Sequence, residues 1–315
     1  MNDFTDLVDL ASERIGGAAV AANDEFFAPK ENLVKAAKPM WLEHEYTDRG
    51  KWMDGWETRR RREPGHDWCV VRLGLPGVIR GVTVDTAYFK GNFPEACSLE
   101  AAEGADGPWT EILPKSPLRG DAENPFPIGA EGRFTHVKLH IHPDGGVARL
   151  RIYGLVAPDP ARLSPGTEVD LAALENGGLV VGASDMFFGA RHNLILPGPP
   201  LGMHDGWETR RRRGPGHDWA VVRLGAPGSI RRIEVDTTYF KGNAPGSCSV
   251  EVTGGDPEAP ETHWREILPQ TALRANALHG FEARTLEGPP STHARLNIFP
   301  DGGVARLRLF GTVAP

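Results

Sequence analysis

Apolar and polar residues alternate in many short segments of the chain, at the two-residue period of a half-buried β-strand. In the first half, this pattern places buried positions at Val82 and Val84, Leu99, Val137, Leu139 and Ile141, and Leu150 and Ile152. In the second half, it places them at Ile233 and Val235, Val250 and Val252, Leu296 and Ile298, and Leu307 and Leu309. Many short strands separated by Gly- and Pro-containing turns predict an all-β fold, an antiparallel sandwich or jelly roll.

Helical periodicity is weak in comparison with this strand pattern. Residues 4–15 and 169–176 predict two short helices, because each run ends in the Gly-Gly pair that is typical of a helix C-cap. The PDGG strings at 143–146 and 300–303 predict a hairpin turn between two strands.

The two halves of the chain repeat one another. DGWETRRRR occurs at 54–62 and 205–213, GHDW at 65–68 and 216–219, and PDGGVARLR at 143–151 and 300–308. A stretch rich in Pro and Gly, 157–166, lies between the copies as a linker would. We therefore predict a tandem duplication, with one domain over residues 1–157 and a second, homologous domain over 158–315.

The copies differ most in the segment that precedes DGWETRRRR. From Asn32 to Asp54 the first copy advances 22 positions, whereas from Asn193 to Asp205 the second advances 12, so the first copy carries ten more residues. The longer segment contains PMWLEHEYTDRGKWM, at 39–53, and the shorter contains only PGPPLGM. Charged and aromatic residues in a loop insertion indicate a functional site, although a lid or a subunit contact explains them equally well.

Composition narrows the classes of function. The 315 residues are 40% hydrophobic and 24% charged, as in soluble globular domains. The net charge of −7 argues against a nucleic-acid partner, and no apolar run is long enough to span a membrane. The N-terminus lacks the apolar core of a signal peptide, so we expect a cytoplasmic protein. Cys69, Cys97 and Cys248 form no CxxC pair and are expected to be packing residues in a reducing compartment.

The four consecutive arginines of each copy are the clearest candidates for ligand binding. Arginine forks bind carboxylates bidentately and stay charged at any working pH, which suits an anionic substrate. In an extended segment Arg59 and Arg61 share one face, and Arg60 and Arg62 share the other. The alternative is a solvated or subunit-facing basic strip that neighbouring acids neutralise.

Histidines supply candidate acid–base or metal chemistry. His66 and His217, each followed by Asp and Trp, are candidates for proton transfer, although each could equally end a turn before a strand. His140 and His142 share a face at strand spacing, as metal ligands might, but the second copy has Asn297 and Phe299 there. No zinc motif is present; a divalent metal held by carboxylates and a histidine stays open, and no cofactor is certain.

These strings together resemble the allantoicase family over nearly the whole chain. The resemblance is carried by DEFFAP at 24–29, YTDRGKWMDGWETRRRR at 46–62 with GHDW, GVIRGVTVDTAYFKGN at 77–92, and MHDGWETRRRRGPGHDWAVVRLG at 203–225. It implies a tandem galactose-binding-like jelly-roll β-sandwich. It also implies a hydrolase that cleaves allantoate to (S)-ureidoglycolate and urea in purine degradation.

The resemblance suggests roles for individual residues. Breaking the C–N bond needs a base for water and an acid for the leaving nitrogen. We expect Glu57 or Asp54 as the base and His66, beside Asp67, as the acid. Substrate-binding candidates are Arg59, Arg60, Arg61, Arg62, Asn32, Lys90 and Trp56. Their second-copy counterparts include Glu208, Arg211, His217 and Asp218, but the longer loop leads us to expect the more complete site in the first copy.

Two other kinds of protein compete with the enzyme hypothesis. Jelly rolls of this type also serve as carbohydrate-binding modules, so a non-catalytic tandem sugar-binding protein is the main alternative. A scaffold whose arginine strips join subunits is the other. The enzyme hypothesis predicts one small-molecule partner, allantoate, no nucleic acid or membrane, and a homo-oligomer.

Overall fold

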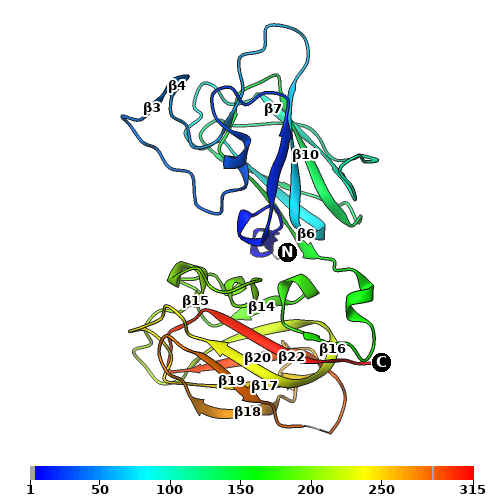
Figure 1. Cartoon of the computed structure of the whole chain (residues 1–315), viewed down its shortest axis with the longest axis vertical. Helices are drawn as coiled ribbons and strands as arrows, with labels where there is room; N and C mark the ends of the chain where they lie inside the picture. The colour runs from blue at the N-terminus through cyan, green and yellow to red at the C-terminus, as the bar shows by residue number, and fades with distance from the viewer. Residues whose placement is uncertain (1–3, 286) are drawn as a thin grey trace. The chain divides into compact units, whose positions relative to one another are not determined.

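The computed structural model describes residues 4–285 and 287–315, and the chain divides into two compact units, Met1–Ala157 and Pro158–Pro315. Figure 1 draws the first unit from blue to green and the second from green to red. Strands and short 3-10 helices are the regular elements of the described residues, which confirms the all-β prediction. None of the described helices is long and apolar enough to cross a membrane.

The first unit is built on one unusually long strand, β6 (Asp67–Asp85). Its first half pairs with β10 (Phe134–His142) and β2 (Ala18–Ala22), and its second half pairs with β12 (Arg149–Val156) and β9 (Glu123–Pro127). The strand order of the sheet is β1-β12-β6-β10-β7-β8, where β1 is Val8–Asp9, β7 is Ala96–Ala102 and β8 is Thr110–Pro117. Because β6 changes partners along its length, it connects both parts of the sheet around one core.

The second unit repeats this arrangement. Its central strand is β16 (Asp218–Asp236), and the sheet order is β13-β22-β16-β20-β17-β18, with β14 and β19 also paired to β16. The bounds are β13 Glu168–Asp170, β14 Leu179–Ala183, β17 Ser247–Thr253, β18 Arg265–Ala272, β19 Leu278–Glu282, β20 Ser291–Phe299 and β22 Arg306–Val313.

Each unit adds a small ladder beside the sheet. In the first unit β5 (Trp56–Glu57) pairs with β11 (Gly146–Val147), and in the second β15 (Trp207–Glu208) pairs with β21 (Gly303–Val304). The first unit alone contributes the described hairpin of β3 (Tyr46–Thr47) and β4 (Gly50–Lys51), which lies in its insertion. The 3-10 helices are η1 Phe4–Asp6, η2 Glu13–Ile15, η3 Lys30–Val34, η4 Pro160–Leu163, η5 Leu174–Asn176, η6 Arg191–Ile195 and η7 Met203–Asp205.

The alternating apolar residues form the core, as predicted. In the first unit Val82, Val84, Leu99, Val137, Leu139, Ile141, Leu150 and Ile152 are all fully buried. Burial of such side chains contributes roughly 1.5–3 kcal/mol each, which makes this cluster the main source of stability. The three cysteines are free and buried, as packing residues should be.

The two predicted helices are wrong over most of their length. Residues 4–15 contain η1, then β1 paired with β12, then η2, and 169–176 contain the end of β13 followed by η5. The Asp9 carboxylate favours an extended segment here over a helix. It accepts one hydrogen bond from the amide of Ala11 and another from the amide of Ile152, which lies on the distant strand β12. Only the C-cap glycines are confirmed: Gly16 and Gly177 have φ of 94° and 87°.

The predicted PDGG hairpins are also wrong. The strand before PDGG, β10, pairs with β6 and β7, and the residues after it enter β11, which pairs with β5. The second glycine has a packing role instead, since a Cβ at Gly146 would lie 2.0 Å from the ring of Phe89. Gly303 meets Phe240 in the same way.

Candidate active site in the first copy

The segment that contains the ten-residue insertion lines one side of a cavity of about 600 Å³ in the first unit. Cavities of this size are typical of small-ligand sites. The insertion supplies one wall, and β5 and the loop after β6 supply the others; the lining residues are Phe27, Trp41, Arg49, Gly50, Lys51, Met53, Glu57, Tyr88, Lys90, Gly91 and Asn92. We call this the insertion cavity. Of the residues predicted as site residues, it contains Glu57 and Lys90.

Glu57 is the acid of the insertion cavity. It lies on β5, between its ladder partner β11 and a backbone bridge to Ala28, so its position is set by the chain on both sides. The amide Nδ2 of Asn92 donates to its Oε1 at 2.7 Å. Burial raises the pKa of Glu57 above its usual value, and the Asn92 hydrogen bond opposes that rise. A carboxylate with a raised pKa is suited to moving a proton near neutral pH.

Three cations line the same cavity as this carboxylate. Arg49 and Lys51 come from the β3–β4 hairpin, and Lys90 from the loop after β6. The Nη1 of Arg49 donates to the carbonyl of Phe26 at 2.8 Å, and the Nζ of Lys51 donates to the carbonyl of Leu42. These contacts hold both cations at the cavity and leave it with more positive than negative side chains.

Two aromatic rings also line the cavity. The rings of Trp41 and Tyr88 have centroids 6.0 Å apart, and the Nζ of Lys51 lies 4.7 Å from the Trp41 ring. Tyr88 has a φ of 68°, which is rare for a residue with a side chain and is sustained here by a 2.7 Å hydrogen bond from its amide to Asp121. Its counterpart Tyr239 adopts the same conformation, with a φ of 73°.

Asp54 anchors the insertion and does not line the cavity. Its Oδ2 accepts from Nη2 of Arg149 at 2.8 Å and from the amide of Met40 at 3.1 Å, and both members of the ion pair are buried. Burial alone would raise the pKa of Asp54, but the Arg149 hydrogen bond and charge hold that pKa below its usual value. The Nε of Arg149 also donates to the carbonyl of Ala37, so one guanidinium fixes both ends of the inserted loop.

The four arginines of the first copy lie in a second, separate hollow of about 270 Å³. We call it the arginine groove; it is lined by Asp24, Arg59, Arg60, Arg61, Arg62, Glu63 and Asp67. Phe26 links the two hollows, because Arg49 and Arg59 both lie over its ring, 5.0 and 5.4 Å from the centroid. The structure therefore separates the predicted arginines from the predicted base.

His66 belongs to neither hollow's lining. Its Nε2 is 2.9 Å from Nδ1 of His140, whose Nε2 is 2.8 Å from Oε2 of Glu100. His142 packs against His66 with ring centroids 4.8 Å apart. Across residues 4–285 and 287–315, no three His, Cys, Asp or Glu side chains are placed to hold one metal ion together.

Asn32 and Trp56 hold the backbone around the cavity from inside the protein. The Nδ2 of Asn32 donates to the carbonyl of Gly55 at 2.8 Å, and Nε1 of Trp56 donates to the carbonyl of Asp24 at 2.8 Å. Both side chains are buried.

Sequence reasoning missed the cavity residues Asn92, Tyr88, Arg49 and Lys51. For the first two a signal existed, because YFKGN is repeated at 88–92 and 239–243. For Arg49 and Lys51 the only signal was that they lie in the insertion.

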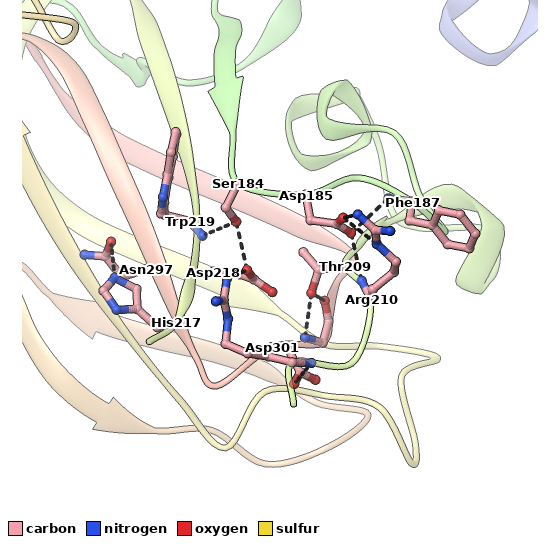
Figure 2. Close-up of polar contacts among 12 residues, drawn as sticks. Ser184, Asp185, Phe187, Thr209, Arg210, His217, Asp218, Trp219, Asn297 and Asp301 are labelled. Atoms are coloured by element: carbon pink, nitrogen blue, oxygen red, sulfur yellow. Dashed lines mark hydrogen bonds and ion pairs between the residues drawn. The ribbon is translucent and has the colours of Figure 1, made fainter. Parts of the chain in front are cut away.

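The second copy lacks the insertion but keeps the Glu–Asn pair and the arginine segment. Asn243 donates to Glu208 as Asn92 does to Glu57. Figure 2 shows the arginine segment of this copy: Arg210 binds Asp185, and the ring of His217 reaches Oδ1 of Asn297, 3.2 Å away. The shorter loop has no counterpart of the segment that carries Trp41, Arg49 and Lys51.

The fold and the insertion cavity define a class: a tandem β-sandwich protein with a cavity of small-ligand size in its first copy, lined by more cations than acids. Comparison with known proteins gives the particular family. The model of the allantoicase repeat matches residues 8–157 and 169–314, once in each unit. The chain belongs to the allantoicase family.

Individual relatives agree with this assignment. The chain is 50% identical to a probable allantoicase of Pseudomonas aeruginosa, over 98% of this chain and 97% of the relative. It is 48% identical to allantoicase of Dictyostelium discoideum, over 97% of this chain and 87% of the relative. The crystal structure of allantoicase from Saccharomyces cerevisiae superimposes with a TM-score of 0.82 at 37% identity, covering 96% of this chain and 92% of that one.

Proposed function

We propose that this chain hydrolyses allantoate to ureidoglycolate and urea in the insertion cavity of its first copy. The observation that carries the proposal is that the Glu57–Asn92 pair and three cations line one hollow. Allantoate is a carboxylate whose central carbon bears two ureido groups. An acid–base residue, a cationic wall and flat aromatic surfaces are the groups that such a molecule requires.

Substrate binding follows from the charges of the cavity. The carboxylate of allantoate binds Arg49 and Lys51, the two cations that the insertion provides, with Lys90 nearby. The flat ureido groups lie against Trp41 and Tyr88. This assignment replaces the expected arginines 59–62 as the carboxylate site, because those residues line the other hollow.

The reaction replaces one C–N bond by a C–O bond. The ionised carboxylate of Glu57 accepts a proton from water as the water oxygen bonds to the central carbon. The C–N bond to one ureido group breaks in the same step, so the central carbon keeps four bonds, and Glu57 donates the proton to the departing nitrogen; urea leaves and Glu57 is ionised again. Asn92 holds the Glu57 carboxylate in place through both proton transfers. In this scheme one residue performs both tasks, and Asp54 and His66, which do not line the cavity, have no direct role.

A matched pair of variants tests the site. Glu57→Gln should lower kcat for urea release from allantoate by about 10²–10⁴-fold, the usual contribution of general acid–base catalysis. Glu208→Gln removes the equivalent carboxylate, with its own amide partner Asn243, from the copy without the insertion. It should leave kcat close to that of the unmodified chain. Equal losses of kcat in both variants would contradict the assignment of the active site to the first copy.

The same assay can also test whether the reaction needs a metal ion. If a divalent ion activates the water, treatment with EDTA should abolish urea release and one divalent ion should restore it. Activity that persists in EDTA would support a reaction carried by Glu57 alone.

We also propose that the chain forms a homo-oligomer and acts in the cytoplasm. Without the insertion, the second copy leaves Phe187, Phe188 and Leu201 more than 60% exposed, which favours a protein interface. Three free, buried thiols suit a reducing compartment. Sedimentation should show an assembly that Phe187→Ser with Phe188→Ser weakens; a monomer at micromolar concentration would contradict the first proposal.

A further inference from the structure

We propose that the arginine groove of each copy binds an oxyanion, a carboxylate or a phosphate, at a site distinct from the insertion cavity. The groove of the first copy is the hollow lined by Arg59–Arg62, Asp24, Glu63 and Asp67. The second copy has Arg210–Arg213, Asp185 and Asp218 at the matching positions, with the same two ion pairs, and we call this segment its arginine groove. The proposal does not depend on catalysis, because the second copy lacks the insertion.

The first and third arginines build the groove by pairing with two of its three acids, Asp24 and Asp67. The Nε of Arg59 donates to Oδ2 of Asp24 at 2.7 Å, and Nη2 of Arg61 donates to Oδ1 of Asp67 at 2.7 Å. The backbone is fixed as well, since the amide of Arg61 donates to Oδ2 of Asp144 at 2.7 Å. The segment is therefore held at three points although it lies outside any strand.

The second and fourth arginines are left without acceptors. Arg60 and Arg62 are exposed, and among the described residues neither side chain has a hydrogen-bond or ion-pair partner. The Nε of Arg61 is buried and also lacks an acceptor. Each guanidinium offers five N–H donors and no acceptor, so the groove has a large excess of donors. A planar or tetrahedral oxyanion supplies the acceptors that the protein does not.

The second copy reproduces this arrangement contact for contact. Arg210 binds Asp185 (Figure 2), Arg212 binds Asp218, and the amide of Arg212 donates to Oδ2 of Asp301 at 2.7 Å. Arg211 and Arg213 are again exposed and without a partner in the described chain. The buried Nε of Arg212 lacks an acceptor, as that of Arg61 does. The excess of donors is thus a property of the repeated motif.

One difference between the copies predicts their order of affinity. Glu63 lines the first groove, whereas the second copy has Gly214 at that position. A carboxylate repels an oxyanion, so the second groove should bind more tightly. Glu63→Gly makes the first groove resemble the second and should tighten its binding by about two- to fivefold, the effect of one exposed charge.

Equilibrium dialysis with labelled inorganic phosphate, and separately with labelled glycolate, tests the proposal on the full chain. Arg60→Gln with Arg62→Gln should remove one bound equivalent, and Arg211→Gln with Arg213→Gln should remove another. The control is Arg72→Gln with Lys115→Gln, which removes two exposed charges outside both hollows and should keep all binding. The anion whose binding the arginine variants lose identifies the ligand chemistry of the grooves.

Two results would overturn the proposal. One is that neither anion is retained by the unmodified chain. The other is that the variant with all four arginines replaced binds as much anion as the control. Because dialysis measures binding alone, failure here leaves urea release by Glu57 untouched, and a catalytically inactive chain can still bind the anion.

Discussion

Replacing two histidines of the first copy by the residues of the second should remove a pH-dependent loss of stability. The double variant is His140→Asn with His142→Phe, which installs the side chains found at Asn297 and Phe299. In the unmodified chain His140 bonds to both His66 and Glu100, and Nε2 of His142 is 3.0 Å from the hydroxyl of Ser98. An asparagine side chain fits at this position, because in the second copy Asn297 occupies it and contacts His217.

The two histidines resist protonation in the folded protein. Burial lowers the pKa of His142 from its usual 6.5 to about 4, and the nearby His66 and Lys115 act in the same direction. Burial also lowers the pKa of His140, with Lys138 and His66 adding to the effect and Glu100 opposing it. In the unfolded chain these two histidines take up protons at about pH 6.5, whereas in the folded chain they take them up only at a lower pH. Stability is therefore complete above pH 6.5 and is lost as the pH falls from 6.5 toward 4.

The magnitude follows from His142. At pH 5 the solution is 1.5 units below the unfolded pKa of 6.5, and each unit corresponds to about 1.36 kcal/mol, which gives roughly 2 kcal/mol. Because His142 is partly exposed, solvent screening reduces this figure to about 1 kcal/mol. Between pH 8 and pH 5, the unmodified first unit should lose about 1 kcal/mol more stability than the variant.

Native-state hydrogen exchange measures this difference within one sample. Amides of β10 report on the first unit, and amides of β20 report on the second, after correction for intrinsic exchange rates. His136 and His293 occupy matching positions and both have pKa values lowered by burial, so their contributions cancel in the comparison. The reasoning fails if β10 and β20 lose protection equally at pH 5, or if the double variant keeps the pH dependence.

Three further variants test the insertion cavity and its anchor. Asn92→Leu removes the hydrogen bond that lowers the pKa of Glu57, so the acidic limb of the kcat/KM profile should move to higher pH; an unmoved limb contradicts proton transfer by Glu57. Arg49→Gln should lower kcat/KM for allantoate by about 10–150-fold, mainly through KM in steady-state assays, because a charged hydrogen bond contributes roughly 1.5–3 kcal/mol. Arg149→Met leaves the buried Asp54 with only the partly exposed Lys35, 3.6 Å away, as a cationic partner, and should lower the free energy of unfolding by about 3–5 kcal/mol in guanidinium titrations; a loss below about 1 kcal/mol contradicts the anchor.

Strand positions were predictable because one physical rule governs them. A strand with one buried face alternates apolar and polar residues, so Val137, Leu139 and Ile141 could be placed in the core from the sequence alone. The family could be recognised in the same way, since the motif strings are long and repeated. The same alternation grouped Arg59 with Arg61, and both do form the ion pairs that build the groove.

Features that depend on partners distant in the chain could not be predicted. PDGG has the composition of a hairpin turn, but Gly146 is required by the Phe89 ring against which it packs. Asp54 has the carboxylate that a catalytic base needs, but only the structure shows that this carboxylate forms a buried ion pair with Arg149, 95 positions later. The Glu57–Asn92 pair is likewise formed between segments that the sequence separates by 35 positions.

The anchoring arginines explain how two copies of one sandwich can differ in function. Arg149 binds the carbonyls of Ala37 and Asp54, and Arg306 binds those of Gly198 and Asp205. Each arginine thus fixes the two ends of the loop before the DGWETRRRR motif, whatever lies between them. The entropic cost of closing a loop grows slowly with its length, so ten added residues cost little stability while the anchors hold. The first copy can therefore enclose the Glu57 carboxylate while the core, the anchor and the arginine groove remain those of the second.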